Sequence, residues 1–280
     1  MRIAIAMVRV LAILTLLVSY SPQACPAAIP HGSVELISEN QWITPGRQSY
    51  LGLHFTMEPG WHTYWVNPGD SGQSPRATWQ LPPGLTAGPI EWPTPHRLGK
   101  STIVDYGYTD AVTLLVPVRA SANFPAQQTA QLGADLKILI CREICIPGKA
   151  QVSLTLPVKS EPPASDERTH ELFVSARKSL PRPAPAGWQF HLTDAKESLV
   201  LSAKLGRRVM GAVFFPLTES QIDNSAQQRF RPLPAGFELT LRKSDLLVAP
   251  IKQLKGVLVL SSGEAYEMEA RVGGGSATGK

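Results

Sequence analysis

The chain has 280 residues, a formal net charge of +5 and a pI of about 9.2. Its charges are scattered, and no basic run is interleaved with aromatic residues, so we expect no nucleic acid among its partners. Three cysteines are too few for a disulfide framework in a chain that buries enough apolar surface to fold without staples.

The N-terminus has the features of a secretory signal. Two arginines precede the apolar segment 10–18, which is too short to span a membrane. Small residues at Ala27 and Ala28 suit cleavage, so we expect a signal peptide at 1–28. A lipid anchor on Cys25 is not expected, because the residues before it lack the leucine usual at such sites. Export delivers the mature chain to an oxidising compartment, where disulfides persist.

Alternating apolar and polar residues then predict β-strands with one buried face. The expected core positions are every second residue from Leu51 to Met57, from Val112 to Val118, from Leu132 to Ile140 and from Val152 to Leu156. The 25 prolines oppose long helices. The pattern predicts an all-β sandwich at 29–158.

A proline-rich linker is expected at 159–187, with a short helix between Asp166 and Leu180. Strand patterns resume after it and predict a second, smaller β-sandwich domain at 188–272. The predicted strands are 199–205, 209–215, 237–241, 256–260 and 266–272. The glycine-rich residues 273–280 are expected to form a disordered tail.

The pair Cys141 and Cys145 holds the two cysteines that remain after signal cleavage. Residues i and i+4 of one continuous strand lie roughly 13 Å apart, so a disulfide requires a tight hairpin or a helical turn between them. Strand parity places Cys141 opposite the core face, which predicts an accessible sulfur. Three interpretations stay open: an inert local disulfide, a redox-active pair, and a two-thiolate site for a soft ion such as Cu(I).

Aromatic and acidic residues elsewhere are candidates for supporting the pair. The segment 61–72 is expected to be a loop in which Tyr64 and Trp65 are either core residues or a wall beside the sulfurs. Tyr106 and Tyr108 pose the same question. Asp70 and Glu143 are acids that could move protons or act only in turns and at the surface. His62, flanked by aromatics, is expected to be structural, with its hydrogen bonds satisfied.

These motifs together resemble a known family. Trp61–Trp65 with Asn67–Gly72, then Trp92-Pro93, Tyr106–Tyr108 and Cys141–Gly148, are similar to the N-terminal periplasmic region of DsbD-type thiol:disulfide interchange proteins, especially the branch linked to suppression of copper sensitivity. The resemblance covers roughly residues 32–158 and continues more loosely through the second domain.

The resemblance implies immunoglobulin-like domains, a periplasmic location and a redox role for Cys141 and Cys145. Electrons would pass from a membrane-embedded donor to a periplasmic thioredoxin-like oxidoreductase, and loop aromatics would shield the pair. Full-length members carry membrane and thioredoxin-like domains that are not found here, so the donor is expected to be a separate membrane protein. The spacing of the cysteines is also narrower than in the best-known members.

We therefore predict a thiol:disulfide exchange protein that uses no cofactor. The alternative is a non-catalytic interaction module, or a Cu(I)-handling module bound through Cys141 and Cys145.

Overall fold

The computed structural model describes residues 26–99 and 102–273. Residues 1–25 of the signal peptide predicted at 1–28, including Cys25, and residues 274–280 of the tail predicted at 273–280 lie outside the described residues. Ala27 and Ala28, at the end of the predicted signal peptide, lie in a β-strand. Within the described part, no helix has the length and apolar character needed to cross a membrane.

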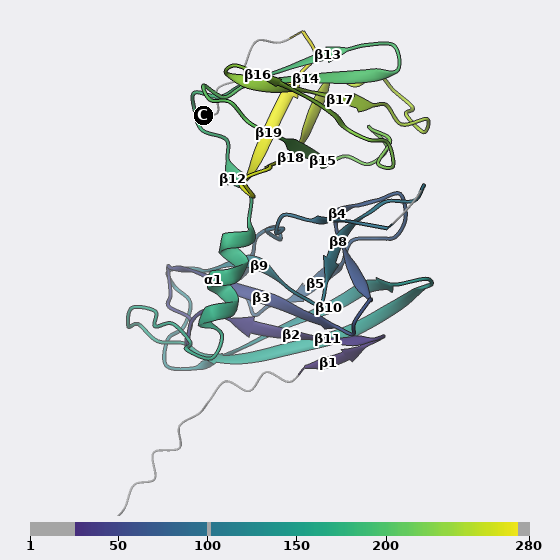
Figure 1. Cartoon of the computed structure of the whole chain (residues 1–280). Coiled ribbons are helices and arrows are strands. Elements are labelled where there is room, and N and C mark those ends of the chain that lie inside the picture. The colour runs from purple at the N-terminus through teal and green to yellow at the C-terminus, as the bar shows by residue number, and fades with distance from the viewer. Residues whose placement is uncertain (1–25, 100–101, 274–280) are drawn as a thin grey trace, which may run out of the picture.

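The first half of the chain forms two facing sheets (Figure 1). One sheet has the order β1 (Ala27–Ile29), β2 (Gly32–Ser38), β3 (Gln48–Met57), β9 (Ala111–Ala120) and β6 (Leu85–Ala87). The other has the order β11 (Cys145–Pro157), β10 (Thr129–Cys141), β4 (His62–Gly69), β8 (Asp105–Thr109) and β7 (His96–Leu98). A further strand, β5 (Arg76–Gln80), pairs with β10.

The core between these sheets consists of the predicted strand faces. The alternating positions of β3, β9, β10 and β11 named from the sequence all belong to one buried apolar cluster. This alternation arises because successive side chains of a strand point to opposite sides of its sheet. The prediction of an all-β fold is confirmed.

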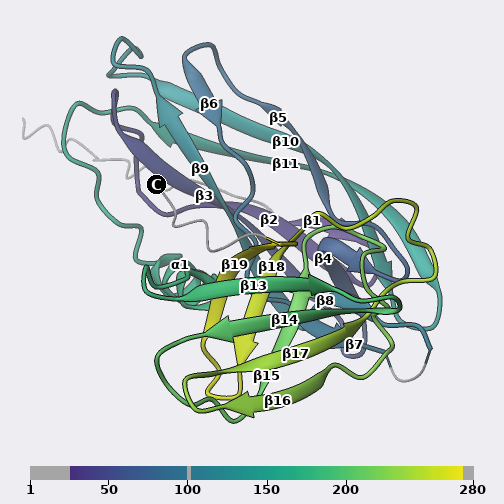
Figure 2. The same cartoon turned by 90° about the horizontal axis from the view of Figure 1, so that it is seen from above.

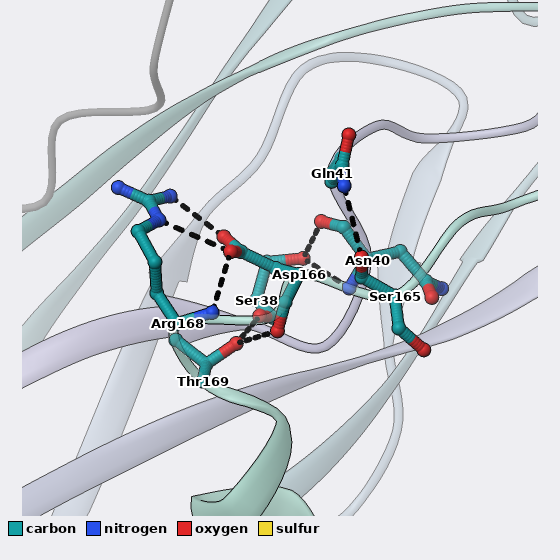
Figure 3. Close-up of polar contacts among 7 residues, drawn as sticks. All are labelled: Ser38, Asn40, Gln41, Ser165, Asp166, Arg168 and Thr169. Carbon is teal, nitrogen blue, oxygen red and sulfur yellow. Dashed lines mark hydrogen bonds and ion pairs between the residues drawn. The ribbon is translucent and has the colours of Figure 1, made fainter.

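The linker holds the one helix among the described residues, α1 (His170–Ser179), inside the predicted stretch. Phe173 and Ala176 pack with Ile37 and Leu115 on the outer side of the first sheet. Figure 3 shows how the chain before the helix is fixed to β2: the Thr169 hydroxyl donates a 2.6 Å hydrogen bond to the Ser38 carbonyl. The helix lies here because its apolar side chains and those on the outer side of the sheet bury each other.

The second half forms two four-stranded sheets. One has the order β12 (Arg182–Pro183), β19 (Ala265–Arg271), β18 (Gln253–Leu260) and β15 (Ala212–Pro216). The other has the order β13 (Gln189–Asp194), β14 (Ser198–Lys204), β17 (Gly236–Arg242) and β16 (Arg229–Leu233). These sheets enclose their own apolar cluster. The predicted domain limits stay a prediction.

The two sandwiches are stacked: the second lies above the first in Figure 1 and over part of it when seen from above in Figure 2. Phe215 of β15 and Val257 of β18 belong to the buried cluster of the first sandwich. The Phe215 ring contacts Trp65 and Tyr106 edge-on, with centroid distances of 6.4 and 5.1 Å. An apolar interface of this kind favours a fixed relative position.

The expectation of a loop at 61–72 is wrong for most of its length, because strand β4 runs through it. The turn-forming sequence Asn67-Pro68-Gly69 ends the strand at an irregularity in the pairing with β8. Asn67 is buried, accepts a hydrogen bond from the Gly69 amide and donates one to the Pro216 carbonyl. Tertiary contacts therefore override the turn propensity, and proline is tolerated at an irregular strand end.

Candidate functional site at the tip of a long hairpin

The cysteine pair closes the tip of the hairpin formed by β10 and β11. The two strands pair over their whole lengths, and Cys141 opposite Cys145 is the last pair. The sulfurs form a disulfide with the α-carbons 4.2 Å apart. Within the turn, the Arg142 amide donates a 3.1 Å hydrogen bond to the Ile144 carbonyl. Of the two geometries allowed by the sequence, the tight hairpin is therefore the one adopted.

The two cysteines differ in exposure. Parity places Cys141 on the side of the sheet opposite the core, as predicted, but the residue is only 2% exposed. The expectation of an accessible Cys141 sulfur is wrong. Cys141 also pairs with His62 of β4, and Tyr64 of the same strand lies on this side of the sheet and reaches the disulfide. Cys145 is the exposed member of the pair.

Tyr64 lies on this outer side of the sheet. It lies two residues after His62 on β4, is fully buried, and donates a hydrogen bond from its hydroxyl to Cys145 Sγ at 3.5 Å. Burial, with a further contribution from the nearby Asp105 carboxylate, raises the pKa of Tyr64 to about 12. The phenol therefore stays protonated at physiological pH and can stabilise a thiolate at Cys145.

Residues 70–72, which follow β4, lie over Tyr64 and are called the covering segment below. Gly72 has a φ of +88°, and a β-carbon at this position would overlap the Tyr64 ring. The neighbouring Ser71 is fixed by Asp105, whose Oδ1 accepts hydrogen bonds from the Ser71 amide and hydroxyl at 3.0 and 2.9 Å. Glycine at position 72 is therefore required for both its backbone conformation and its close approach to the ring.

His62 lies beside this cluster in an unexpected state. Its ring meets Tyr64 edge-on at 5.2 Å, and its Nε2 is 3.9 Å from Asp105 Oδ2. Among the described residues, this buried Nε2 has no hydrogen-bond partner, so the expectation of a fully satisfied histidine is wrong. Burial lowers the pKa of His62, and the Asp105 charge opposes this effect. Burial also raises the pKa of Asp105.

The other predicted supporting residues lie elsewhere. Trp65 belongs to the main core, and the Tyr108 hydroxyl donates to the Pro93 carbonyl at 2.7 Å. Tyr106 is buried at the interface between the sandwiches. Glu143 is exposed on the turn between the cysteines. Of the four aromatic candidates, Tyr64 is the one that contacts a sulfur.

Asp70 connects the covering segment to the second sandwich. Its Oδ1 accepts a 2.7 Å hydrogen bond from Asn224 Nδ2, and its Oδ2 accepts one from the Val104 amide at 2.8 Å. Asn224 Oδ1 accepts a 2.9 Å hydrogen bond from the Tyr106 hydroxyl. No sequence pattern points to Asn224, because this contact joins residues 154 positions apart.

The turn itself is supported by an aromatic stack. The Arg142 guanidinium carbon lies 5.0 Å from the Trp61 ring centroid. On that ring His31 stacks in parallel, with centroids 3.7 Å apart. No group of three or more His, Cys, Asp and Glu side chains in the described part of the chain could hold a metal ion. A Cu(I) ion at the tip would therefore depend on the two cysteine sulfurs.

The fold and the site define a protein of two stacked β-sandwiches with a half-exposed disulfide at a hairpin tip. Residues 33–157 match the family model described as thiol:disulfide interchange protein DsbD, N-terminal. The resemblance predicted from the motifs is thus confirmed for this stretch, and it supports a role related to thiol–disulfide interchange.

A solved structure has the same fold over both sandwiches. The crystal structure of the N-terminal periplasmic domain of ScsB from Proteus mirabilis aligns with a TM-score of 0.65 and 17% sequence identity, covering 87% of this chain and 94% of that one. At this identity the similarity establishes the fold alone. The comparison with curated proteins finds no match.

Proposed function

We propose that the protein exchanges disulfides with partner proteins through Cys141 and Cys145. The observation that carries the proposal is the asymmetric pair at the hairpin tip, with Cys145 exposed and beside the Tyr64 hydroxyl while Cys141 is buried. Exchange requires a thiolate that can reach a partner sulfur, followed by a second thiol that resolves the mixed disulfide. The match of residues 33–157 to a thiol:disulfide interchange family supports this assignment.

The geometry supports a distinct role for each sulfur. In the reduced protein, the Cys145 thiolate attacks a partner disulfide, forms a mixed disulfide and releases one partner sulfur as a thiolate. Cys141 then attacks Cys145 Sγ, which restores the internal disulfide and releases the second partner sulfur. The protein loses two electrons and the partner gains two. In the reverse sequence, a dithiol of the electron donor reduces the Cys141–Cys145 disulfide and is itself oxidised to a disulfide.

The partners follow from this chemistry and from the related proteins. A thioredoxin-like oxidoreductase is the proposed acceptor, and a separate membrane protein is the proposed electron donor. The periplasm is the proposed location, because the structurally similar ScsB domain from Proteus mirabilis is periplasmic. Such a compartment keeps the Cys141–Cys145 bond oxidised unless a donor reduces it.

Two measurements test the proposal. Equilibration in glutathione buffers should give a reduction potential between about −120 and −270 mV, the range of exchange proteins, whereas a value below about −300 mV would indicate a structural bridge. Reduced Cys141→Ser should trap a partner as a stable mixed disulfide through Cys145. Cys145→Ser, with its remaining thiol buried, should trap far less. Equal trapping by both variants would contradict the assigned order.

If the potential indicates a structural bridge, the non-catalytic module becomes the better description. Titration of the reduced protein with Cu(I), competed by a copper chelator, then tests the metal-handling version. Binding at micromolar or tighter affinity that is lost in Cys145→Ser would support it.

A further inference from the structure

The outer side of the hairpin carries three cations in one row. Register places Lys137 of β10 directly opposite Lys149 of β11 on one side and Arg76 of β5 on the other. All three are exposed, and none forms an ion pair within the described part of the chain. Like charges in directly opposed cross-strand positions repel each other, so this row is electrostatically unfavourable until an anion binds to it.

This cationic row lies on the same face as the disulfide. Along the hairpin, the successive outer pairs are Lys137 with Lys149, Leu139 with Pro147, and Cys141 with Cys145. Four residues along a strand correspond to about 13 Å. A groove of about 620 Å³ extends from the row toward the tip, lined by the three cations, Leu139 and Pro147, with Gln73 and Ser74 also in its lining. Those last two residues directly follow Gly72.

One carboxylate on this face, that of Asp135, is bound by neutral donors and forms no ion pair with the row in the described part of the chain. Asp135 lies two residues before Lys137, and its two oxygens accept hydrogen bonds from the Gln80 and Gln151 amides at 2.6 and 2.8 Å. The Asp135 carboxylate is therefore held between two neutral donors beside the groove. The three cations remain available to an anionic group arriving from outside.

We propose that this groove docks an acidic, extended segment of the redox partner, whose disulfide then meets Cys145. The inference rests on the proposed exchange function and adds the chemistry of the partner. Charge complementarity and the shared face both favour this occupant. Carboxylates on the row would leave a segment of about four extended residues to reach the disulfide. Steering of this kind raises association rates by tenfold or more and weakens with salt.

The test uses synthetic peptides as probes. Each peptide carries one Cys as a mixed disulfide with 2-mercaptoethanol, and three residues placed four to six positions from it are Glu in one peptide and Gln in the other. The oxidation rate of the reduced protein is measured with both peptides at low and high salt. The protein should prefer the Glu peptide by about tenfold at low salt.

The triple variant Arg76→Gln, Lys137→Gln, Lys149→Gln should lose this preference. The matched control removes three exposed cations of the second sandwich, by Lys204→Gln, Arg208→Gln and Lys252→Gln, and should keep it. Equal rates for the two peptides, or equal loss in both variants, would overturn the docking proposal. If neither peptide oxidises the wild-type protein, the exchange function itself fails, which separates the two conclusions.

Discussion

Asn224 of the second sandwich donates a 2.7 Å hydrogen bond to Asp70, two residues before the glycine that covers Tyr64. The same amide side chain accepts a hydrogen bond from Tyr106. The segment that covers Tyr64 near the hairpin tip is thus hydrogen-bonded to a part of the chain that has no cysteine. The second sandwich therefore helps to hold the covering segment in position over Tyr64.

Asn224→Ala should lower the free energy of unfolding by about 1–3 kcal/mol, because it removes two hydrogen bonds and leaves the buried Tyr106 hydroxyl unpaired. It should also speed reduction of the disulfide by dithiothreitol, since the cover is less firmly held. Urea unfolding and thiol release measure the two effects. The control is Arg97→Ala, which removes an exposed hydrogen bond to the Ser225 carbonyl of the second sandwich. That variant should change stability by no more than about 0.5 kcal/mol.

Gly72→Ala should destabilise the protein more than Gly263→Ala does. The two glycines have nearly equal φ values of +88° and +87°, but a β-carbon at position 263 meets no atom within 4 Å, whereas one at position 72 overlaps the Tyr64 ring. Backbone conformation alone should cost about 1 kcal/mol in both, and the steric overlap should add about 1–3 kcal/mol at position 72. Thermal unfolding of the pair isolates the overlap; equal losses would show that Gly72 does not press on Tyr64.

Tyr64→Phe should make the Cys145 thiolate harder to form. With its pKa raised to about 12, the phenol is a hydroxyl donor throughout the range in which thiols titrate. When the reduced protein is alkylated at a series of pH values, the loss of a hydrogen bond to a charged group should move the midpoint of the reaction by about one pH unit to higher pH. The matched variant is Tyr108→Phe, which loses a hydroxyl bound to the Pro93 carbonyl. An unchanged midpoint in Tyr64→Phe would remove the tyrosine from the proposed chemistry.

Stability should fall as the pH drops from about 7.5 toward 5. Burial lowers the pKa of His54 and His62 below the ordinary histidine value of 6.5. In this window the unfolded chain binds more protons than the folded one, so the free energy of unfolding decreases with falling pH. Asp105, whose pKa is raised by burial, has the opposite effect on the free energy of unfolding, in the more acidic range where its carboxyl group titrates. Chemical unfolding at several pH values should show a shallower slope for His62→Gln; an identical slope would contradict the prediction for this residue.

Much of the first sandwich is predictable because its inner faces follow strict alternation. The pattern identifies Leu132 to Ile140 and Val152 to Leu156, whose inward positions lie in the core. It misses strand β4, since Asn67-Pro68-Gly69 has the local composition of a turn and is held in place by Pro216, 149 positions along the chain from Asn67. Local propensity does not contain such contacts.

The site is predictable to a smaller degree. Parity alone gives the outward direction of Cys141, but not its burial beside β4, which pairs with Cys141 at His62 and brings Tyr64 to the disulfide. Asp105 and Asn224 carry no local motif, and their roles arise from packing between distant segments. Pairing register, which places Lys137 beside Arg76, likewise emerges only when β5 is docked on β10.

The apolar layer shared by the two sandwiches has a consequence for folding. Because Phe215 and Val257 complete the core of the first sandwich, neither half can melt without exposing buried surface of the other. The halves should therefore behave as one cooperative unit, with a single calorimetric transition whose enthalpy scales with the whole described chain. Separating the halves would expose the aromatic surface around Trp65 and Tyr106 of the first half, and an exposed apolar surface of this kind is prone to self-association.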